Sequence, residues 1–413
     1  MKGENGKMKS DLEQTEIEAP YELPEGWKWV QQNEVCKLTD GEKRTGTEFP
    51  YLEVKYLRGK KEKDFVSTGK FIKAGTKVIL VDGENSGEVF TVPEDGFMGS
   101  TFKALEISNV NENYLQYFIH TKKDLYRNNK KGSAIPHLDK KLFFTMPFPL
   151  PPTLAEQQRI VNRIESMFAK LDEAKEKAQN VVDGFETRKA AILHKAFTGE
   201  LTAKWRKENG VSDDSWEEKL FDSCIAKMQN GLSKRSGNEG EETVVLRLAN
   251  MGEDDFDVSD LRTIKLTSKE KNNYSLAKND VVMIRVNGSK TNVGRQLLVK
   301  NNKGWSFCDH IIRIQFEVFC LPNYMVYFSK TKEYIDYVQD NMVSSAGQNT
   351  ISRKGLSNLR LKIPSLPEQQ EIVRILDTVL EKETRAKEAA QTVLDQIALL
   401  KKSILARAFR GEL

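Results

Sequence analysis

Apolar residues recur at alternating spacings of three and four along two long segments of the chain, 153–201 and 364–413. In the first segment they are Ile164, Met167, Leu171, Ala174, Ala178, Val181, Phe185 and Ile192; in the second, Leu376, Val379, Ala386, Ala390, Val393, Ile397, Leu400 and Ile404. Arg188 and Glu383 are polar interruptions. This spacing predicts one helix in each segment, about 65 Å long at about 1.5 Å per residue, with a seam for a second helix.

The two segments are copies of one another. Residues 156–201 and 368–413 align without a gap and share 21 identities in 46 positions, from "EQQ" to "AFTGEL" and "AFRGEL". The matching continues more weakly upstream: Trp27 against Trp216, 51–57 against 245–251, and 114–122 against 324–332. The chain is therefore an internal repeat of two halves, each a variable region followed by a nearly constant helix.

The repeated helices begin after proline-containing stretches, "PFPLPPT" and "KIPSLP", and end near Gly199 and Gly411. Proline is tolerated at a helix start, and glycine accepts the left-handed conformation that ends a helix. A rod of this length cannot bury an apolar stripe on itself, so we expect the two helices to pair. Chain length allows either orientation, and an antiparallel pairing would give pseudo-twofold symmetry. The alternative is two independent helices, each packed on its own domain.

We expect five segments: a flexible lead-in at 1–20, domain 1 at 21–152, a long helix at 153–201, domain 2 at 202–363 and a second long helix at 364–413. Both domains contain short apolar runs bounded by turn residues, such as "KVILVDG" at 77–83, "VVMIRVNG" at 281–288 and "HIIRIQFEVF" at 310–319. Each domain then has an aromatic helix, "YLQYFIHTKKDLYR" or "YMVYFSKTKEYIDYV". The predicted fold class is α+β.

Composition and charge narrow the class of protein. No apolar run approaches the roughly 20 residues that span a bilayer, and the four cysteines show no pairing pattern, so we expect a soluble, cytoplasmic protein. The net charge is only +4, but residues 1–26 hold 3 basic and 7 acidic side chains whereas 27–152 hold 20 and 16. This mild basic excess permits nucleic-acid binding without requiring it.

Catalytic and metal-binding motifs are weak. "NGSKT" at 287–291 lacks the Gly-Lys order of a phosphate loop, and there is no Asn-Pro-Pro-aromatic tetrapeptide of the amino-methyltransferase kind. Asp40, Glu53 and Lys55 have a loose nuclease-like spacing that could hold Mg²⁺. Cys308, His310 and Cys320 are three soft ligands without a fourth, which favours core packing for Cys308 and Cys320 and leaves His310 as a single histidine in a polar turn. We therefore predict no catalytic residue and no metal site in this chain.

Binding chemistry is the stronger signal. Basic and amide side chains gather in predicted loops of both domains, where lysine and arginine could neutralise phosphates and Arg, Asn and Gln could bind base edges. The DNA-binding candidates of domain 1 are Lys55, Arg58, Lys60, Lys61, Lys63, Lys130, Lys131 and His137, and the same stretch holds Lys122, Lys123 and Arg127. Those of domain 2 are Lys234, Arg235, Arg285, Asn287, Ser289, Lys290, Arg295, Gln348 and Asn349. A solvated face is the alternative for each cluster.

Over nearly its whole length the chain resembles the specificity subunit of type I restriction-modification enzymes. The resemblance rests on "PLPPTLAEQQRIVNRIE…AILHKAFTGEL" and its second copy, "IPSLPEQQEIVRILD…SILARAFRGEL". It implies two target-recognition domains that each read half of a split double-stranded DNA sequence. It also implies that the two long helices form an antiparallel coiled coil, which spaces these domains and docks two methyltransferase subunits, with restriction subunits added through them. S-adenosylmethionine, ATP and Mg²⁺ would then belong to the partners. The alternatives are a Mg²⁺-dependent nuclease and a coiled-coil scaffold that does not bind DNA.

Overall fold

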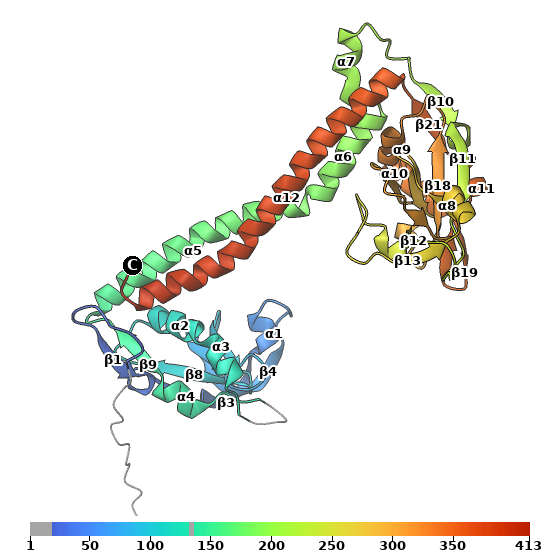
Figure 1. Cartoon of the computed structure of the whole chain (residues 1–413). Helices are drawn as coiled ribbons and strands as arrows, with labels where there is room; N and C mark the ends of the chain where they lie inside the picture. Colours follow the sequence, from blue (N-terminus) through green and yellow to red (C-terminus); the bar gives the residue numbers. More distant parts are fainter. Residues whose placement is uncertain (1–18, 132–135) are drawn as a thin grey trace, which may run out of the picture. The chain divides into compact units, whose positions relative to one another are not determined.

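The chain folds into two compact units, each of which combines a globular domain with parts of the long helices. The computed structural model describes residues 19–131 and 136–413 (Figure 1). Unit 1 joins the chain up to residue 179 with residues 391–413, and unit 2 spans residues 180–390. The predicted lead-in at 1–20 lies outside the described residues apart from Ala19 and Pro20.

The domain of unit 1 contains three small sheets and four short helices. An antiparallel pair, β1 (Lys28–Gln31) with β9 (Pro147–Leu150), carries the chain into and out of the domain. A four-stranded sheet has the order β2 (Cys36–Thr39), β8 (Phe102–Ile107), β5 (Lys77–Leu80), β6 (Val89–Thr91). The strands β3 (Glu42–Leu52), β4 (Phe65–Ile72) and β7 (Gly96–Met98) close into a small barrel. The helices are α1 (Val54–Leu57), α2 (Glu112–Thr121), α3 (Lys123–Asn128) and α4 (Lys140–Thr145).

The domain of unit 2 repeats this plan and adds to it. The antiparallel pair is β10 (Glu217–Leu220) with β21 (Arg360–Ile363), and the four-stranded sheet has the order β11 (Ile225–Asn230), β18 (Ile311–Phe316), β14 (Val281–Ile284), β16 (Gln296–Leu298). A second sheet has the order β13 (Thr263–Leu266), β12 (Glu241–Leu246), β17 (Ser306–Phe307). A third has the order β15 (Val286–Asn287), β20 (Gln348–Thr350), β19 (Val343–Ser345). The helices are α7 (Ala203–Glu208), α8 (Ser268–Tyr274), α9 (Pro322–Phe328), α10 (Lys332–Asn341) and α11 (Arg353–Leu356).

The sequence repeat is therefore also a structural repeat. In the four-stranded sheets, β8 and β18 come last in the sequence but lie second in the spatial order. In the smaller sheets, β3 is antiparallel to β4 and parallel to β7, and β12 is likewise antiparallel to β13 and parallel to β17. The predicted α+β class with an internal repeat is confirmed. Among the described residues, no helix combines the length and apolarity needed to cross a bilayer.

The first long helix differs from its prediction in one respect. The segment 153–201 forms two helices, α5 (Leu154–Asp183) and α6 (Phe185–Phe197), separated by Gly184. The Arg188 guanidinium folds back over this position and donates a hydrogen bond to the carbonyl oxygen of Val181 at 2.9 Å. A Cβ atom at Gly184 would lie 2.4 Å from Arg188 Nη1, so only glycine leaves room for this arrangement. The second long helix, α12 (Leu366–Phe409), is unbroken over 44 residues.

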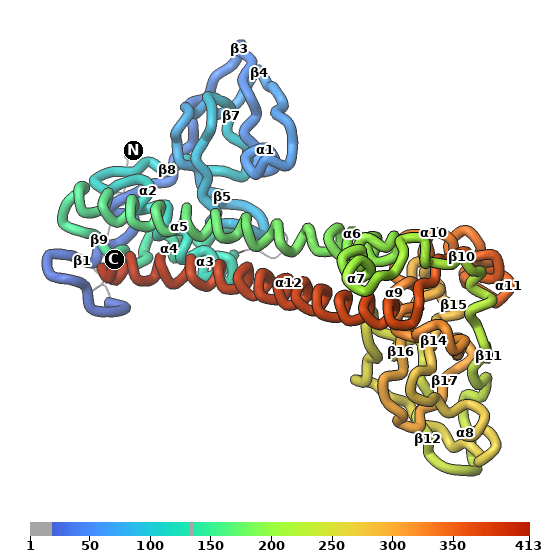
Figure 2. Tube along the Cα trace, turned by 90° about the horizontal axis from the view of Figure 1, so that it is seen from above, coloured from blue at the N-terminus to red at the C-terminus, as the bar shows by residue number. Residues whose placement is uncertain are grey.

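The long helices pair in antiparallel fashion within each unit, as Figure 2 shows for α5 and the C-terminal part of α12. In unit 1, Arg159 Nη2 donates to the carbonyl of Leu413 at 2.8 Å and Lys401 pairs with Asp172 at 2.6 Å. In unit 2, Arg188 pairs with Glu383 at 2.7 Å. The two polar interruptions of the predicted seam thus satisfy each other, which explains how the coil tolerates both.

The seam residues of the first helix are placed as predicted. Ile164, Ala178 and Phe185 are buried, and Met167, Leu171, Val181 and Ile192 are half-buried. In α12, Leu376, Ala390 and Ile397 are buried and Val379 and Ile404 are half-buried.

The prediction is wrong for Val393 and Leu400, which are 39% and 47% exposed. Their places on the inner face are taken by the neighbouring residues Leu394 and Lys401, and Ala386 is likewise exposed beside the half-buried Lys387. The ammonium of Lys387 lies 4.3 Å from the Phe185 ring centre, and that of Lys401 lies 4.8 Å from the Phe168 ring centre. Lysines cover aromatic rings with their stems while keeping the charge hydrated, so an apolar pattern assigns these positions wrongly.

The end of each long helix packs on the aromatic helix of a domain. In unit 1, the Phe409 ring lies 5.0 Å from that of Tyr114 and 5.4 Å from that of Phe118. In unit 2, the Phe197 ring lies 4.9 Å from Tyr324 and 5.5 Å from Phe328. The repeated "AF" of "AFTGEL" and "AFRGEL" therefore makes the same contact twice. The following Gly199 and Gly411 adopt positive φ angles of 86° and 74°, as predicted for helix ends.

Candidate nucleic-acid interface

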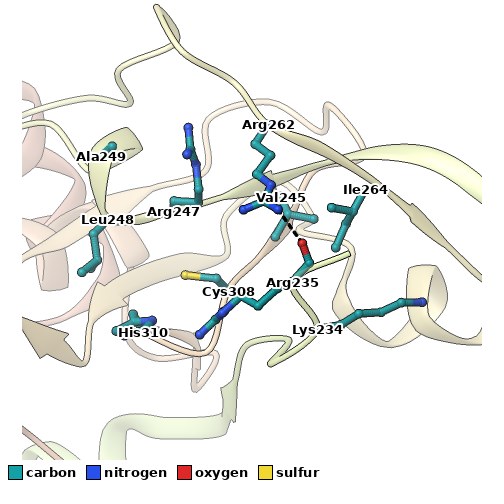
Figure 3. A pocket seen from close by; sticks show the side chains of 10 residues that line it. All are labelled: Lys234, Arg235, Val245, Arg247, Leu248, Ala249, Arg262, Ile264, Cys308 and His310. Atoms are coloured by element: carbon teal, nitrogen blue, oxygen red, sulfur yellow. Dashed lines mark hydrogen bonds between the residues drawn. The ribbon is translucent and has the colours of Figure 1, made fainter. Parts of the chain in front are cut away.

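A pocket in the domain of unit 2 gathers several basic side chains (Figure 3). It is lined by Lys234, Arg235, Val245, Arg247, Leu248, Ala249, Arg262, Ile264, Cys308 and His310. The floor is apolar, since Val245, Ile264 and Cys308 are buried. The rim carries four cations.

Neighbouring strands bring these cations together. Arg247 follows the last residue of β12 and Arg262 precedes the first residue of β13. The two strands are antiparallel, with Val244 opposite Thr263, and the Val245 amide donates to the Arg262 carbonyl at 2.9 Å. The end of one strand therefore meets the start of the other. Lys234 and Arg235 come from the segment after β11, which reaches the same place.

Most guanidinium groups at the pocket are held by backbone and carboxylate oxygens. Arg262 Nη2 donates to the Arg235 carbonyl at 2.6 Å, drawn as a dashed line in Figure 3. Arg235 pairs with Asp309 at 2.8 Å, and Arg247 with Asp260 at 2.8 Å. Arg247 Nε is buried and has no hydrogen-bond partner among the described residues. These arginines are fixed in place and retain unused N–H donors.

The charges at the pocket leave a positive excess. Lys234 pairs with Glu270 at 3.0 Å, so Glu270, Asp260 and Asp309 face four cations before any proton is added to His310. Oriented guanidinium groups form charge-assisted hydrogen bonds to phosphate oxygens. The pocket is therefore suited to an anionic group such as a phosphate of a nucleic-acid backbone.

Cys308 and His310 belong to the only metal-ligand-like cluster that was found in the described part of the chain. The ligand atoms of Cys308, Asp309 and His310 lie within 4.8 Å of one another. Asp309 already faces a fixed cation, Arg235, and lies 3.1 Å from His310 Nδ1. Burial raises the pKa of the Cys308 thiol, which disfavours the thiolate. Cys320 packs in a different core, with Cys224, so the predicted core role of these cysteines is confirmed.

The amide candidates lie on the small sheet β15–β20–β19. Gln348 is exposed at the start of β20, next to Gly347, which has a φ of 77°. Asn349 is only 6% exposed, and its Nδ2 donates to the carbonyls of Asn287 at 3.3 Å and Gly288 at 2.9 Å. Asn287 Oδ1 accepts from the Ser289 amide at 2.8 Å. Asn349 and Asn287 therefore brace this sheet, whereas Gln348 has a side chain open to a ligand.

The remaining candidates of domain 2 divide in the same way. Burial lowers the pKa of Arg295, and its Nη2 donates to the Met251 carbonyl at 2.5 Å, which gives it a structural role. Arg285 Nη1 reaches the Asp309 carbonyl at 3.5 Å and so lies beside the pocket. Ser289 shares a hydrogen bond with Thr291 at 2.9 Å in a turn that also exposes Lys290.

In domain 1 most predicted cations have carboxylate partners. Arg58 pairs with Glu88, Lys61 with Glu53 at 2.7 Å, and Lys63 with Glu94 at 3.1 Å. Lys130 pairs with Glu84 at 2.6 Å, Lys131 with Asp139 at 3.0 Å, and His137 Nδ1 with Asp82 at 2.6 Å. Both Lys55 and Lys60 are exposed, and no ion pair is found for either in the described ranges 19–131 and 136–413. These two lysines have the most freely available charge.

The nuclease-like residues are engaged by lysines. Asp40 pairs with Lys70 and with Lys103, the latter at 2.7 Å, and these hydrogen bonds lower the pKa of Asp40 to about 2. Glu53 pairs with Lys61. Carboxylates that face ammonium groups are poor ligands for Mg²⁺, so the geometry gives the nuclease alternative no support.

Sequence reasoning missed Arg247 and Arg262 as candidates. They lie 15 positions apart in the sequence and neither belongs to a run of basic residues. The signal that could have found them is their place at the adjoining ends of two apolar, β-branched runs, 243–246 and 263–266.

Comparison with known proteins agrees with the repeat. The family described as "Type I restriction modification DNA specificity domain" matches residues 24–182 and 221–394. The StySPI specificity subunit of Salmonella potsdam is 33% identical over 310 residues, which cover 74% of this chain and 66% of that protein. The EcoKI specificity subunit of Escherichia coli strain K12 is 29% identical over 300 residues, covering 71% and 64%. The matches thus span slightly less than two thirds of these relatives.

A solved structure shares the fold. The HsdS subunit from Thermoanaerobacter tengcongensis superposes with a TM-score of 0.63 over 96% of this chain and 100% of that chain, at 20% identity.

Proposed function

Because the chain belongs to the family of type I restriction-modification specificity subunits, we propose that it is the DNA-recognition subunit of such a complex and reads a two-part DNA sequence. The observation that carries the proposal is the double match of the family, once on each half of an internally repeated chain. Each domain would read one half-site, and the paired helices would set the distance between them. The complex would act on DNA in the cytoplasm.

Phosphate contacts and base contacts have separate roles in this proposal. Arg247, Arg262, Lys55 and Lys60 would neutralise phosphates, which adds affinity without sequence preference. Gln348 is open to solvent and has the donor and acceptor needed for a base edge.

The chain would supply no catalysis of its own. Methyl transfer and DNA cleavage would belong to two methyltransferase subunits and to restriction subunits added through them, with S-adenosylmethionine, ATP and Mg²⁺ bound there. The exposed apolar residues Leu399 and Leu400 of α12, 68% and 47% accessible, support helix docking by such a partner. Leu399→Asp should abolish co-purification with the methyltransferase while leaving the melting temperature of the chain unchanged.

The central experiment exchanges one recognition domain. A chimera in which residues 27–150 come from another family member should methylate a motif altered in one half only, as measured by methylome sequencing of cells that also contain the methyltransferase. An exchange that rewrites both halves contradicts the proposal. Cleavage of DNA by the purified chain with Mg²⁺ alone would support the nuclease alternative instead.

A second experiment tests the pocket. Arg247→Ala and Arg262→Ala should each weaken binding to all duplex sequences and reduce the slope of log K against log salt by about one unit. Arg374→Ala is the matched control, because it removes the same charge from an exposed site on α12. If the control and the pocket variants behave alike, the pocket does not contact DNA.

A further inference from the structure

A groove in unit 1 gathers cations at a place unrelated to the pocket described above. It lies between the segment α2–α3 and the last turns of α12, and encloses about 370 Å³. Its floor includes Phe118, Leu405 and Phe409, and its walls carry His120, Lys122, Lys123, Lys402 and Arg410. A groove of this size admits several side chains of a peptide.

One of the four lysine and arginine side chains of this groove, Lys402, has a carboxylate partner among the described residues, and that partner, Asp124, also lines the groove. Lys402 pairs with Asp124 at 3.3 Å, and both side chains are 74% exposed. Lys122 lies 5.3 Å from the Phe118 ring and Arg410 lies 5.6 Å from the Tyr21 ring. Among the residues that the structure describes, no ion pair is found for Lys122, Lys123 or Arg410. Burial lowers the pKa of Lys122, which is the expected cost of holding an ammonium group here without a counter-ion.

The corresponding groove in unit 2 also encloses about 400 Å³, but carboxylates of the chain itself line it. Phe118, His120 and Lys122 of α2 and its end correspond to Phe328, Lys330 and Lys332, and Leu405 and Phe409 correspond to Leu193 and Phe197. Two carboxylates lie across this groove: Glu253 is 3.5 Å and Asp254 is 3.6 Å from the ammonium of Lys189 on α6, and Asp254 also pairs with Lys330. An acidic loop therefore balances the cations of unit 2.

The matching loop of unit 1 has the opposite charge. The alignment of 51–57 with 245–251 continues into "RGKK" at 58–61 against "GEDD" at 252–255. Arg58 is held by Glu88, and Lys61 by Glu53 and Asp64, all within domain 1. The positions that hold Glu253, Asp254 and Asp255 in unit 2 thus hold no carboxylate in unit 1.

We propose that the groove of unit 1 docks an acidic polypeptide segment of a partner protein. Aspartate and glutamate side chains of that segment take the positions that Glu253 and Asp254 take in unit 2. A polypeptide fits better than duplex DNA, because the groove is recessed between two helices with an apolar floor, and carboxylates of a polypeptide loop line its counterpart. The proposal concerns this groove alone and does not depend on the proposed DNA recognition.

Binding of a labelled peptide to the full-length chain tests this docking site. The probe is a fluorescein-labelled peptide that repeats Gly-Glu-Asp-Asp, followed by fluorescence anisotropy. Reversing two exposed cations, Lys402→Glu with Arg410→Glu, should weaken binding roughly tenfold or more. The matched control is Lys170→Glu with Lys175→Glu, which makes the same charge change on exposed positions of α5. Lys123→Glu alone provides a milder variant if the double reversal unfolds the chain.

The outcomes are distinct. Loss of peptide binding in the groove variants, with the control unchanged, supports the docking site. Equal loss in groove and control variants shows a non-specific charge effect and overturns it. Groove variants that keep peptide binding and lose binding to duplex DNA also overturn it, because the groove is then a DNA contact.

Discussion

Both units contain the repeated sequence "EQQ" near the start of a long helix. Its first glutamine makes the same contact in both units, whereas its glutamate does not. In unit 1, Gln157 Oε1 accepts from the Asn111 amide at 2.7 Å, and in unit 2, Gln369 Oε1 accepts from the Leu321 amide at 2.7 Å. Asn111 and Leu321 are the N-cap residues of α2 and α9. The glutamine of "EQQ" therefore ties the start of a long helix to the start of the aromatic helix in both halves.

The preceding glutamate has no such constant role. Glu156 is partly exposed and pairs with Arg159 of its own helix at 2.8 Å. Glu368 is fully buried, and its Oε1 accepts from Thr202 and Arg206, each at 2.7 Å. The repeated glutamine thus attaches the long helix to its domain in both units, while the glutamate before it has different partners in each.

The largest loss of stability is expected at Phe409, whose packing on an aromatic helix is repeated by Phe197 in the other half. Phe409→Ala should lower the free energy of unfolding by about 3–5 kcal/mol, because the ring is 3% exposed and packs on Tyr114 and Phe118. Phe197→Ala should cost less, since Phe197 is only half-buried. Denaturant unfolding measures the loss, and hydrogen exchange should report it in α2 for the first variant and in α9 for the second. Leu399→Ala, at a residue 68% exposed, is the control and should change stability by no more than about 0.5 kcal/mol.

The second largest loss of stability is expected at the arginine partners of Glu368 and Glu156, where the two halves differ. Arg206→Met removes the partner of a fully buried carboxylate and should cost about 3 kcal/mol or more, whereas Arg159→Met breaks an exposed pair and should cost less than about 1 kcal/mol. Thermal unfolding of both variants gives the comparison. Equal losses would show that Glu368 has access to water and that the two halves are alike at this position.

Periodicity predicted the long helices and their pairing, and the alignment of 156–201 with 368–413 predicted their repeat, because each depends on many positions at once. Their antiparallel orientation is implied only by the resemblance to specificity subunits. Periodicity did not predict the break at Gly184, beside which the Arg188 guanidinium donates a hydrogen bond to the preceding turn. It also placed Val393 and Leu400 on the seam, since it could not assign Lys387 and Lys401 to an inner face. A lysine can bury its apolar stem and keep its ammonium group in water, so a pattern that counts only apolar residues misses it.

The wrong assignment of Val393 to the seam can be tested against Val181, the equivalent residue of the repeat. Val181 is half-buried and Val393 is 39% exposed. Val181→Asp should cost about 1–3 kcal/mol, because a charge is moved toward apolar surroundings, and Val393→Asp should cost less than about 1 kcal/mol. Chemical denaturation measures both. A larger loss for Val393→Asp would restore the predicted seam and contradict the observed one.

The candidate interface was predictable only in part. Runs of basic residues pointed to Lys234 and Arg235, which lie in the pocket, but also to Lys61 and Lys130, which are held by carboxylates. Arg247 and Arg262 meet only because two strands pair, and strand pairing is a long-range property that no local run reveals. Likewise, the sequence made Asn349 a DNA-binding candidate, although its side-chain amide donates to two backbone carbonyls.

The smallest effect is expected at Asp40, which corresponds to Asn230 at the ends of the equivalent strands β2 and β11. Asp40→Asn makes unit 1 resemble unit 2 at this position and removes two lysine contacts. The carboxylate is 48% exposed, so solvent screens both pairs and the loss at neutral pH should be below about 1 kcal/mol. Hydrogen bonds from Lys103 and Lys70 lower the pKa of Asp40 to about 2, below its ordinary value of 3.8.

Since the folded-state pKa is depressed, the stabilisation is present above the ordinary pKa and is lost as the pH falls through about 2. Urea unfolding of parent and variant should therefore differ at about pH 6 and converge progressively below about pH 4. Added salt should also narrow the difference, because exposed pairs are screened. A difference that is constant with pH would mean that the Asp40 charge contributes nothing, and that the asparagine of unit 2 and the aspartate of unit 1 are interchangeable.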